Sequence, residues 1–115
     1  MREGEALRDI QAAASAAGHR LFRVNVGKAW VGKVVSRSDK HVTLENPRPF
    51  HAGMIEGQSD LIGWTRDGTF AAIEVKAGRT ATTEAQRRFV DAVIAAGGRA
   101  GIVRSVDEAM AILDG

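Results

Sequence analysis

A short apolar segment that contains two opposite charges constrains the fold of this chain more than any other feature. Residues 68–78 read GTFAAIEVKAG, with Glu74 and Lys76 among small and β-branched residues. On a strand Glu74 and Lys76 would share one face, because successive side chains point to opposite faces. Ile73 and Val75 would share the other. Burying a carboxylate and an ammonium beside a core is unfavourable unless they are paired, bind a metal or open to a cleft. The segment therefore predicts either a surface strand or a functional site.

The composition is that of a soluble globular protein. The chain has 115 residues, of which 44% are hydrophobic and 26% charged. This length suits one domain, which we expect to span residues 1–115. No apolar run approaches the roughly 20 residues that cross a bilayer. The chain has no cysteine, which excludes disulfides and thiolate zinc sites and fits a reducing compartment. We expect a cytoplasmic protein.

Positive charge is concentrated in one segment, although the net charge is only +2. Between positions 20 and 48 the basic residues outnumber Asp39 and Glu45; they are Arg20, Arg23, Lys28, Lys33, Arg37, Lys40 and Arg48. Such a cluster is either a solvated surface or a patch that binds a polyanion, and nucleic acid is the first candidate.

The spacing of apolar residues predicts an α/β fold. Helical periodicity and end signals predict helices over 3–17, 83–96 and 106–113. Alternation predicts strands over 21–26, 30–35, 41–44, 60–64, 68–78 and 100–104. Residues 45–59 hold both prolines and two glycines, and are predicted as a loop. The expected order is α-β-β-β-β-β-α-β-α, with a mixed β-sheet flanked by helices.

Residues 60–76 read as a hairpin with a three-residue loop, Arg-Asp-Gly, in which glycine takes the left-handed position. Symmetric pairing about this loop places Asp60 opposite Glu74. Their Cβ atoms would be about 4.5–5.5 Å apart. Two carboxylates at that distance repel each other unless a cation lies between them, and Mg²⁺ or Mn²⁺ suits oxygen ligands. The alternative is a surface cluster of Asp60, Glu74 and Lys76 without a function.

The same residues resemble a known nuclease pattern. Asp60 followed by Glu74-Val75-Lys76 matches the PD-(D/E)xK motif, with Ser59 where the motif's proline often stands. More specifically, the chain resembles the VRR-NUC (virus-type replication–repair nuclease) family, especially its small stand-alone phage-type members. The motifs that carry this resemblance occur in family order: FRVNVGKAWVG (22–32), NPRPF (46–50), GQSDLIGW (57–64), IEVKAG (73–78) and TEAQ (83–86).

The resemblance implies a restriction-endonuclease-like core and a metal-dependent endodeoxyribonuclease. Asp60 and Glu74 would be metal ligands, joined by the Val75 carbonyl. Lys76 would orient or activate the attacking water and stabilise charge on the phosphate. Gln86 would complete the catalytic site from the following helix. Gln86 also has a purely structural alternative, because its spacing from Thr83 fits a capping box.

The family also places a glutamate from its first helix beside the metal. Glu3 precedes Leu7 and Ile10 by four and seven residues and so lies on the inward face of the predicted helix. Glu5 lies roughly opposite that face. We assign the role to Glu3; the alternative is a solvated acid favoured by the helix dipole.

Five residues are candidates for DNA contacts. Arg23 and Asn25 share a strand face, and Lys28 follows them; the alternative for these residues is edge-strand solvation. Arg79 and Thr80 come after the Glu74 strand and before a helix N-terminus, a position that favours anions.

The resemblance implies a structure-specific endonuclease that acts on branched DNA, a Holliday-junction resolvase working as a homodimer in a bacterial or phage-infected cell. It needs no nucleotide cofactor and no membrane, and whether one or two metal ions bind is left open. Two alternatives remain. One is a nuclease that prefers flaps or nicks, and the other is a DNA-binding module that has lost catalysis.

Overall fold

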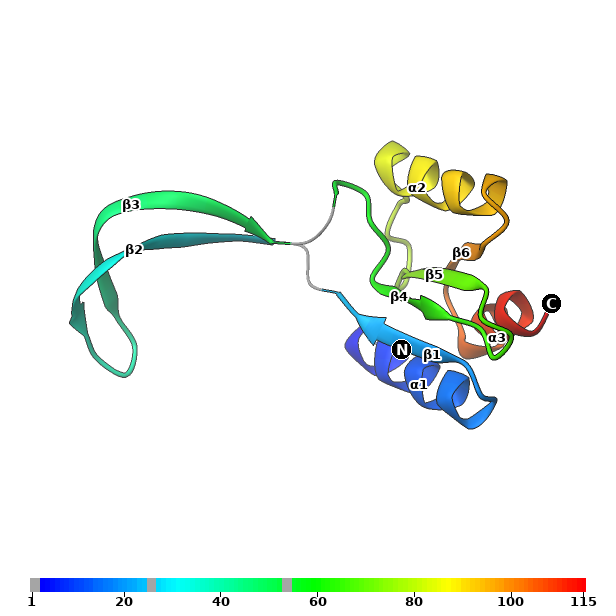
Figure 1. The fold of residues 1–115 in the computed structure, drawn as a ribbon. Helices are drawn as coiled ribbons and strands as arrows, with labels where there is room; N and C mark the ends of the chain where they lie inside the picture. Colours follow the sequence, from blue (N-terminus) through cyan, green and yellow to red (C-terminus); the bar gives the residue numbers. More distant parts are fainter. Residues whose placement is uncertain (1–2, 25–26, 53–54) are drawn as a thin grey trace.

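A four-stranded mixed sheet forms the body of the molecule. The computed structural model describes residues 3–24, 27–52 and 55–115 (Figure 1). The sheet has the strand order β1 (Arg20–Arg23), β4 (Leu61–Trp64), β5 (Phe70–Val75) and β6 (Arg99–Val103). β1, β4 and β5 pair antiparallel, whereas β5 and β6 pair parallel. The parallel pair is connected through a helix, as parallel neighbours require.

Helices cover both faces of this sheet. α1 (Glu3–Ala16) and α3 (Val106–Asp114) lie on one face, and α2 (Glu84–Ala95) lies on the other (Figure 1). The larger core cluster lies beneath α1 and α3; its members include Leu7, Ile10, Leu61, Ile73, Val75, Val103 and Leu113. A smaller cluster under α2 consists of Ala72, Val90 and Ala100, with Ile62, Phe89, Val93 and Ile102 packed against it.

The helix ends follow the signals in the sequence. Gly18 ends the first helix with a φ of +90°, a conformation that favours glycine. Thr83 caps α2 through a capping box with Gln86, as predicted. Ser105 caps α3 by accepting a hydrogen bond from the Glu108 amide.

The predicted hairpin register is confirmed. Leu61 pairs with Ile73, and Trp64 pairs with Phe70. The Thr65 amide donates to the Thr69 carbonyl at 2.8 Å, which leaves residues 66–68 as the loop, and Gly68 has a φ of +83°. Within the loop, the Thr65 hydroxyl and the Thr69 amide both donate to the carboxylate of Asp67. These contacts fix the register that brings Asp60 towards Glu74.

A long two-stranded ribbon projects from the body (Figure 1). It consists of β2 (Gly27–Arg37) and β3 (Val42–Ala52), paired antiparallel as a separate sheet. The prediction of a loop over 45–59 is wrong for residues 45–52. Proline is tolerated there because each strand of a ribbon has an outer edge that needs no hydrogen bonds. Asn46, at a φ of 51°, lies in a register shift beside Pro47, and Pro49 pairs with Trp30.

The fold class and the element order predicted from the sequence are confirmed, and the mixed α/β architecture is consistent with a restriction-endonuclease-like core. Two strands are longer than predicted, and both belong to the ribbon rather than to the mixed sheet. The first strand is shorter and ends at Arg23. Within the described part of the chain, no helix is long and apolar enough to cross a membrane.

Candidate active site

Asp60 is held where the first hairpin strand begins. Its Oδ2 accepts a hydrogen bond of 3.0 Å from the Val75 amide, across the hairpin. Its own carbonyl accepts a 3.0 Å hydrogen bond from the Val24 amide, which follows β1. The carboxylate is therefore tied to the end of β5, one residue from Glu74, as the predicted register requires. Val75 itself is fully buried, and a role for its carbonyl as a ligand stays a prediction.

Glu74 is a buried acid with an incomplete set of partners. Its side chain is only 3% exposed, and its Oε1 accepts a 3.4 Å hydrogen bond from Gln86 Nε2. Its Oε2 is buried and accepts no hydrogen bond from the described residues. Burial is the main cause that raises the pKa of Glu74 to about 8, and the neighbouring Asp60 carboxylate is the second. A cation here would relieve both causes.

Lys76 extends the same strand face and is buried as well. It is 8% exposed, and its amide donates to the Val103 carbonyl at 2.9 Å, which continues the parallel ladder beyond β5. Its ammonium acts against the other causes and lowers the pKa of Glu74. The opposite charges of Glu74 and Lys76 therefore lie near each other, as the alternation of the strand predicts.

Gln86 caps its helix and also reaches Glu74, while its role in catalysis stays a prediction. Its Oε1 accepts from the Thr83 amide at 3.0 Å, which completes the capping box. Its Nε2 donates to Glu74 at 3.4 Å. One amide side chain therefore fixes the start of α2 and connects that helix to the acidic pair.

A cleft of about 640 Å³ opens over Asp60, Glu74 and Gln86, whereas Lys76 does not line it. Its lining includes Asp60, Glu74, Gln86 and the predicted DNA contact Arg23. The sequence interpretation missed the other charged lining residues, which are Glu56, Glu84 and Arg88. The spacing of Glu84 and Arg88, four residues apart on one helix face, is the signal that would have found two of them.

The site fits a hard divalent cation. Two adjacent carboxylates, one of which has a buried oxygen that accepts no hydrogen bond from the described residues, are ligands that hard divalent cations prefer. Glu3 also raises the pKa of Glu74, though less than Asp60 does, and its role as a metal ligand stays a prediction. Among the described residues, however, no three acidic, histidine or cysteine side chains already converge on one point.

The other predicted DNA contacts lie outside the cleft or outside the described residues. Arg79 and Thr80 are exposed between β5 and α2. The guanidinium of Arg104 donates to the Gly78 carbonyl at 2.6 Å and to the Thr80 carbonyl at 2.8 Å, and so holds that segment in place. Asn25 is not among the described residues, and of Lys28 only the backbone is described, in β2.

Comparison with known proteins agrees with this geometry. The family model of the VRR-NUC domain matches residues 3–107, a span that contains every candidate site residue. No curated protein matches the sequence. Because the matched span covers nearly the whole chain, the protein belongs to the VRR-NUC family of PD-(D/E)xK nucleases.

Proposed function

We propose that this nuclease is a Mg²⁺- or Mn²⁺-dependent, structure-specific endonuclease that resolves four-way DNA junctions as a homodimer. The observation that carries the proposal is the convergence of Asp60, Glu74 and Gln86 in one cleft, with Lys76 on the same strand face as Glu74. A surface cluster without a function would not bury Glu74 and Lys76, because burying charged groups is costly. A pure binding module would have no use for that arrangement.

Asp60 and Glu74 would hold the metal ion. When bound, a divalent ion acts as a Lewis acid on the phosphate and lowers the pKa of a coordinated water. The carboxylates tie the ion to β4 and β5, because Asp60 is itself fixed by the Val75 amide. An ion held by Asp60 and Glu74 would be open to a phosphodiester backbone, because both residues line the cleft.

Lys76 and Gln86 would act on the reacting groups. The ammonium of Lys76 supplies a positive charge beside the phosphate and orients the attacking water without competing as a ligand. The Gln86 amide, whose donor already reaches Glu74, holds that carboxylate in its ligating orientation. Arg23 and Arg88, at the cleft wall, are placed to contact phosphates on either side of the cut.

The preference for DNA structure over sequence rests on the kind of contacts available. Basic residues of the ribbon and the cleft wall contact phosphates, which carry no sequence information. A four-way junction requires two symmetric cuts, and a C₂ dimer supplies two sites from a chain that has one.

The test is cleavage of a synthetic four-way junction and of a linear duplex of the same sequence, with Mg²⁺, with Mn²⁺ or with EDTA. We expect paired, metal-dependent cuts on the junction only. Lys76→Ala should lower the rate by at least about a hundredfold, because charge stabilisation in a cleft is worth several kcal/mol. Arg66→Ala is the matched control, since it removes a cation at the far end of the β4–β5 hairpin.

Other outcomes separate the alternatives. Junction binding without cutting, in the presence of either metal, would leave a binding module. Equal cutting of both substrates would leave a nuclease without structural preference. Preferential cutting of a flap or nicked duplex would replace the resolvase by the other structure-specific enzyme.

A further inference from the structure

One half of the sheet face under α2 is left uncovered. α2 packs on β5 and β6, whereas β1 and β4 carry large apolar side chains on the same face. The register places Phe22 opposite Ile62 and Trp64 opposite Phe70, all on the α2 side. Trp64 is 49% exposed, and the rings of Phe22 and Trp64 lie 5.5 Å apart. A sheet face with this content normally lies against another layer.

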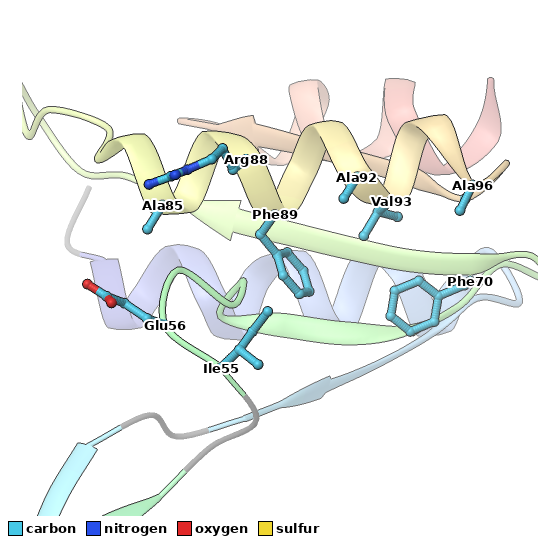
Figure 2. Close-up of a pocket in the computed structure, with 10 residues that line it drawn as sticks. Ile55, Glu56, Phe70, Ala85, Arg88, Phe89, Ala92, Val93 and Ala96 are labelled. Carbon is cyan, nitrogen blue, oxygen red and sulfur yellow. The ribbon is translucent and has the colours of Figure 1, made fainter.

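An apolar groove continues this open face. It has a volume of about 620 Å³ and runs along α2, with Phe70, Phe89 and Val93 in its lining. Figure 2 shows Phe89 directed from the helix towards Ile55 on the opposite wall, with Phe70 farther along. Because Phe70 belongs both to the groove and to the open sheet face, the two form one continuous apolar surface, here called the open face.

The projecting ribbon has an apolar side that is also uncovered. Across the ladder, the register puts Trp30, Val34 and Val42 on one side, where Arg37 at the tip of the ribbon pairs with Val42. Trp30 is 65% exposed, and Val34 and Val42 are exposed too. Lys33, Glu45 and Arg48 share the opposite side, which also carries Val31 and Phe50. The ribbon's strands contact chiefly each other, and an isolated two-stranded hairpin is marginally stable in water.

We propose that the ribbon of one copy packs its Trp30–Val34–Val42 side across the open face of a second copy, and receives the partner's ribbon in return. This rests on the homodimer of the proposed function and names its surface. A single exchange covers both uncovered surfaces, which belong to the same chain. The reciprocal contact closes a two-fold dimer and leaves Lys33 and Arg48 on the solvent side. A DNA backbone would bind the side of the ribbon that carries Lys33 and Arg48, and not the Trp30–Val34–Val42 side.

The dimensions suit such an exchange. Eleven-residue strands reach roughly 36 Å at about 3.3 Å per residue, enough to cross a small domain. Each buried aromatic side chain contributes roughly 150–250 Å². Trp30, Phe22 and Trp64 are 65%, 49% and 49% exposed, so in both halves of the dimer they contribute roughly 500–800 Å², about half of the roughly 1,600 Å² of a stable interface, and Val34, Val42 and Phe70 add to that area.

The absence of cysteine from the chain makes a cross-linking test direct. Val34→Cys protein and Arg20→Cys protein, each with a different tag, are mixed and treated with a short bismaleimide. Arg20 lies opposite Trp64, on the edge of the open face. We expect a cross-link between the two tagged chains. Lys33→Cys is the matched control, because it is the next residue and lies on the opposite side of the ribbon; its yield should be at least fivefold lower.

Each alternative gives a different result. A dominant Val34–Val34 cross-link would show ribbon packing against ribbon and would overturn the exchange, as would equal yields from Val34→Cys and Lys33→Cys. If wild-type protein is a dimer by light scattering but the mixed cross-link does not form, the ribbon exchange is contradicted and the homodimer is not. A protein that is monomeric at micromolar concentration would contradict both the ribbon exchange and the homodimer. Nuclease activity is measured separately, by junction cleavage.

Trp30→Asp supplies a second readout. The buried residues of both core clusters lie outside the ribbon, so this variant should keep the wild-type circular dichroism. Its dimer dissociation constant should rise at least a hundredfold, because a charge replaces the central aromatic of the contact. A Trp30→Asp protein that dimerises as tightly as wild type would overturn the proposal.

Discussion

At the scale of single residues, Glu74 combines two properties that conflict in the metal-free protein. It is nearly inaccessible to water, and it adjoins a second carboxylate. Both properties oppose its ionisation, and the raised pKa near 8 reports that opposition. The same two properties suit the divalent cation that we propose for this site. Glu74 therefore destabilises the metal-free fold at alkaline pH.

This conflict predicts a pH dependence of stability. In EDTA, folded Glu74 keeps its proton up to about pH 8, whereas the unfolded chain releases it near the ordinary glutamate pKa of 4.5. Between these values the folded state binds more protons, so the contribution of Glu74 to stability is lost as pH rises through this window. Glu74→Gln removes this loss of stability on ionisation. At pH 9 the unfolding free energy of the variant should be higher than that of wild type by on the order of a few kcal/mol. Urea denaturation from pH 5 to pH 9 measures it.

Metal addition supplies the control for that prediction. At pH 8 Mg²⁺ should raise the melting temperature of wild type and leave Glu74→Gln unchanged, because a ligand that binds only the folded state stabilises it. A stability difference between the two proteins that is equal at pH 5 and pH 9 would contradict the assigned ionisation of Glu74.

The two roles of Gln86 can be separated by a pair of substitutions. Thr83→Ala removes the cap but leaves the Gln86 amide beside Glu74, and should cost about 1 kcal/mol of stability with a cleavage rate within threefold of wild type. Gln86→Ala removes both contacts and should also lower the cleavage rate about tenfold or more, the equivalent of one hydrogen bond. Junction cleavage at 25 °C and thermal melts measure the two effects. Equal rate losses would mean that Gln86 acts through the helix alone.

At the scale of elements, the β4–β5 hairpin positions the site, and it depends on a glycine for a reason other than flexibility. A Cβ at Gly63 would lie 1.9 Å from the Arg20 carbonyl oxygen. β1 could not pair with β4 at its present distance. Gly68 is the contrasting case, because its φ of +83° requires glycine while a Cβ there would meet nothing within 4 Å.

Gly63→Ala should therefore lower the unfolding free energy by roughly 3 kcal/mol or more, since the clash is with backbone that cannot rotate away. Gly68→Ala should cost only about 1–2 kcal/mol, the strain of a left-handed alanine. Chemical denaturation of both variants provides the comparison. A larger loss for Gly68→Ala would mean that the turn, and not the β1–β4 pairing, limits stability.

The hairpin and the ribbon show where the sequence was informative about elements. The loop glycine and the alternation of β5 fixed a register that could be predicted residue by residue, and with it the meeting of Asp60 and Glu74. The prolines of β3 were misleading, because proline argues against a central strand but not against an exposed ribbon edge. The local sequence around these prolines does not distinguish a loop from an exposed ribbon strand.

The candidate site was predictable to the extent that its residues lie on one hairpin. Gln86 came from a family motif, and its contact with Glu74 depends on how α2 packs on the sheet. Arg88 was missed because its place at the cleft is set by the same packing, which the sequence does not encode locally. The choice between Glu3 and Glu5 likewise depends on how α1 lies relative to β5, and Glu3 stays a prediction.

At the scale of the whole molecule, the distribution of charge determines how DNA is held. The net charge of +2 is small, but the ribbon places Lys33 and Arg48 on one side, away from the side proposed to pack on the partner. Each phosphate contact releases counterions, so the logarithm of the association constant falls with the logarithm of salt concentration by about 0.9 per contact. The ribbon should therefore contribute to affinity in a way that is sensitive to salt.

We expect the double substitution Lys33→Ala/Arg48→Ala to reduce the salt slope of junction binding by about 2, the equivalent of two lost phosphate contacts. Binding is measured from 50 to 300 mM salt in EDTA, which prevents cutting. The control is Arg66→Ala, which removes a cation at the far end of the hairpin and should leave the salt slope unchanged. Junctions of two unrelated sequences should lose affinity equally, because phosphates carry no sequence information. A loss confined to one sequence would mean that the ribbon enters a groove and reads base edges, since the major groove admits a two-stranded ribbon. The nuclease would then select its substrates by sequence as well as by structure.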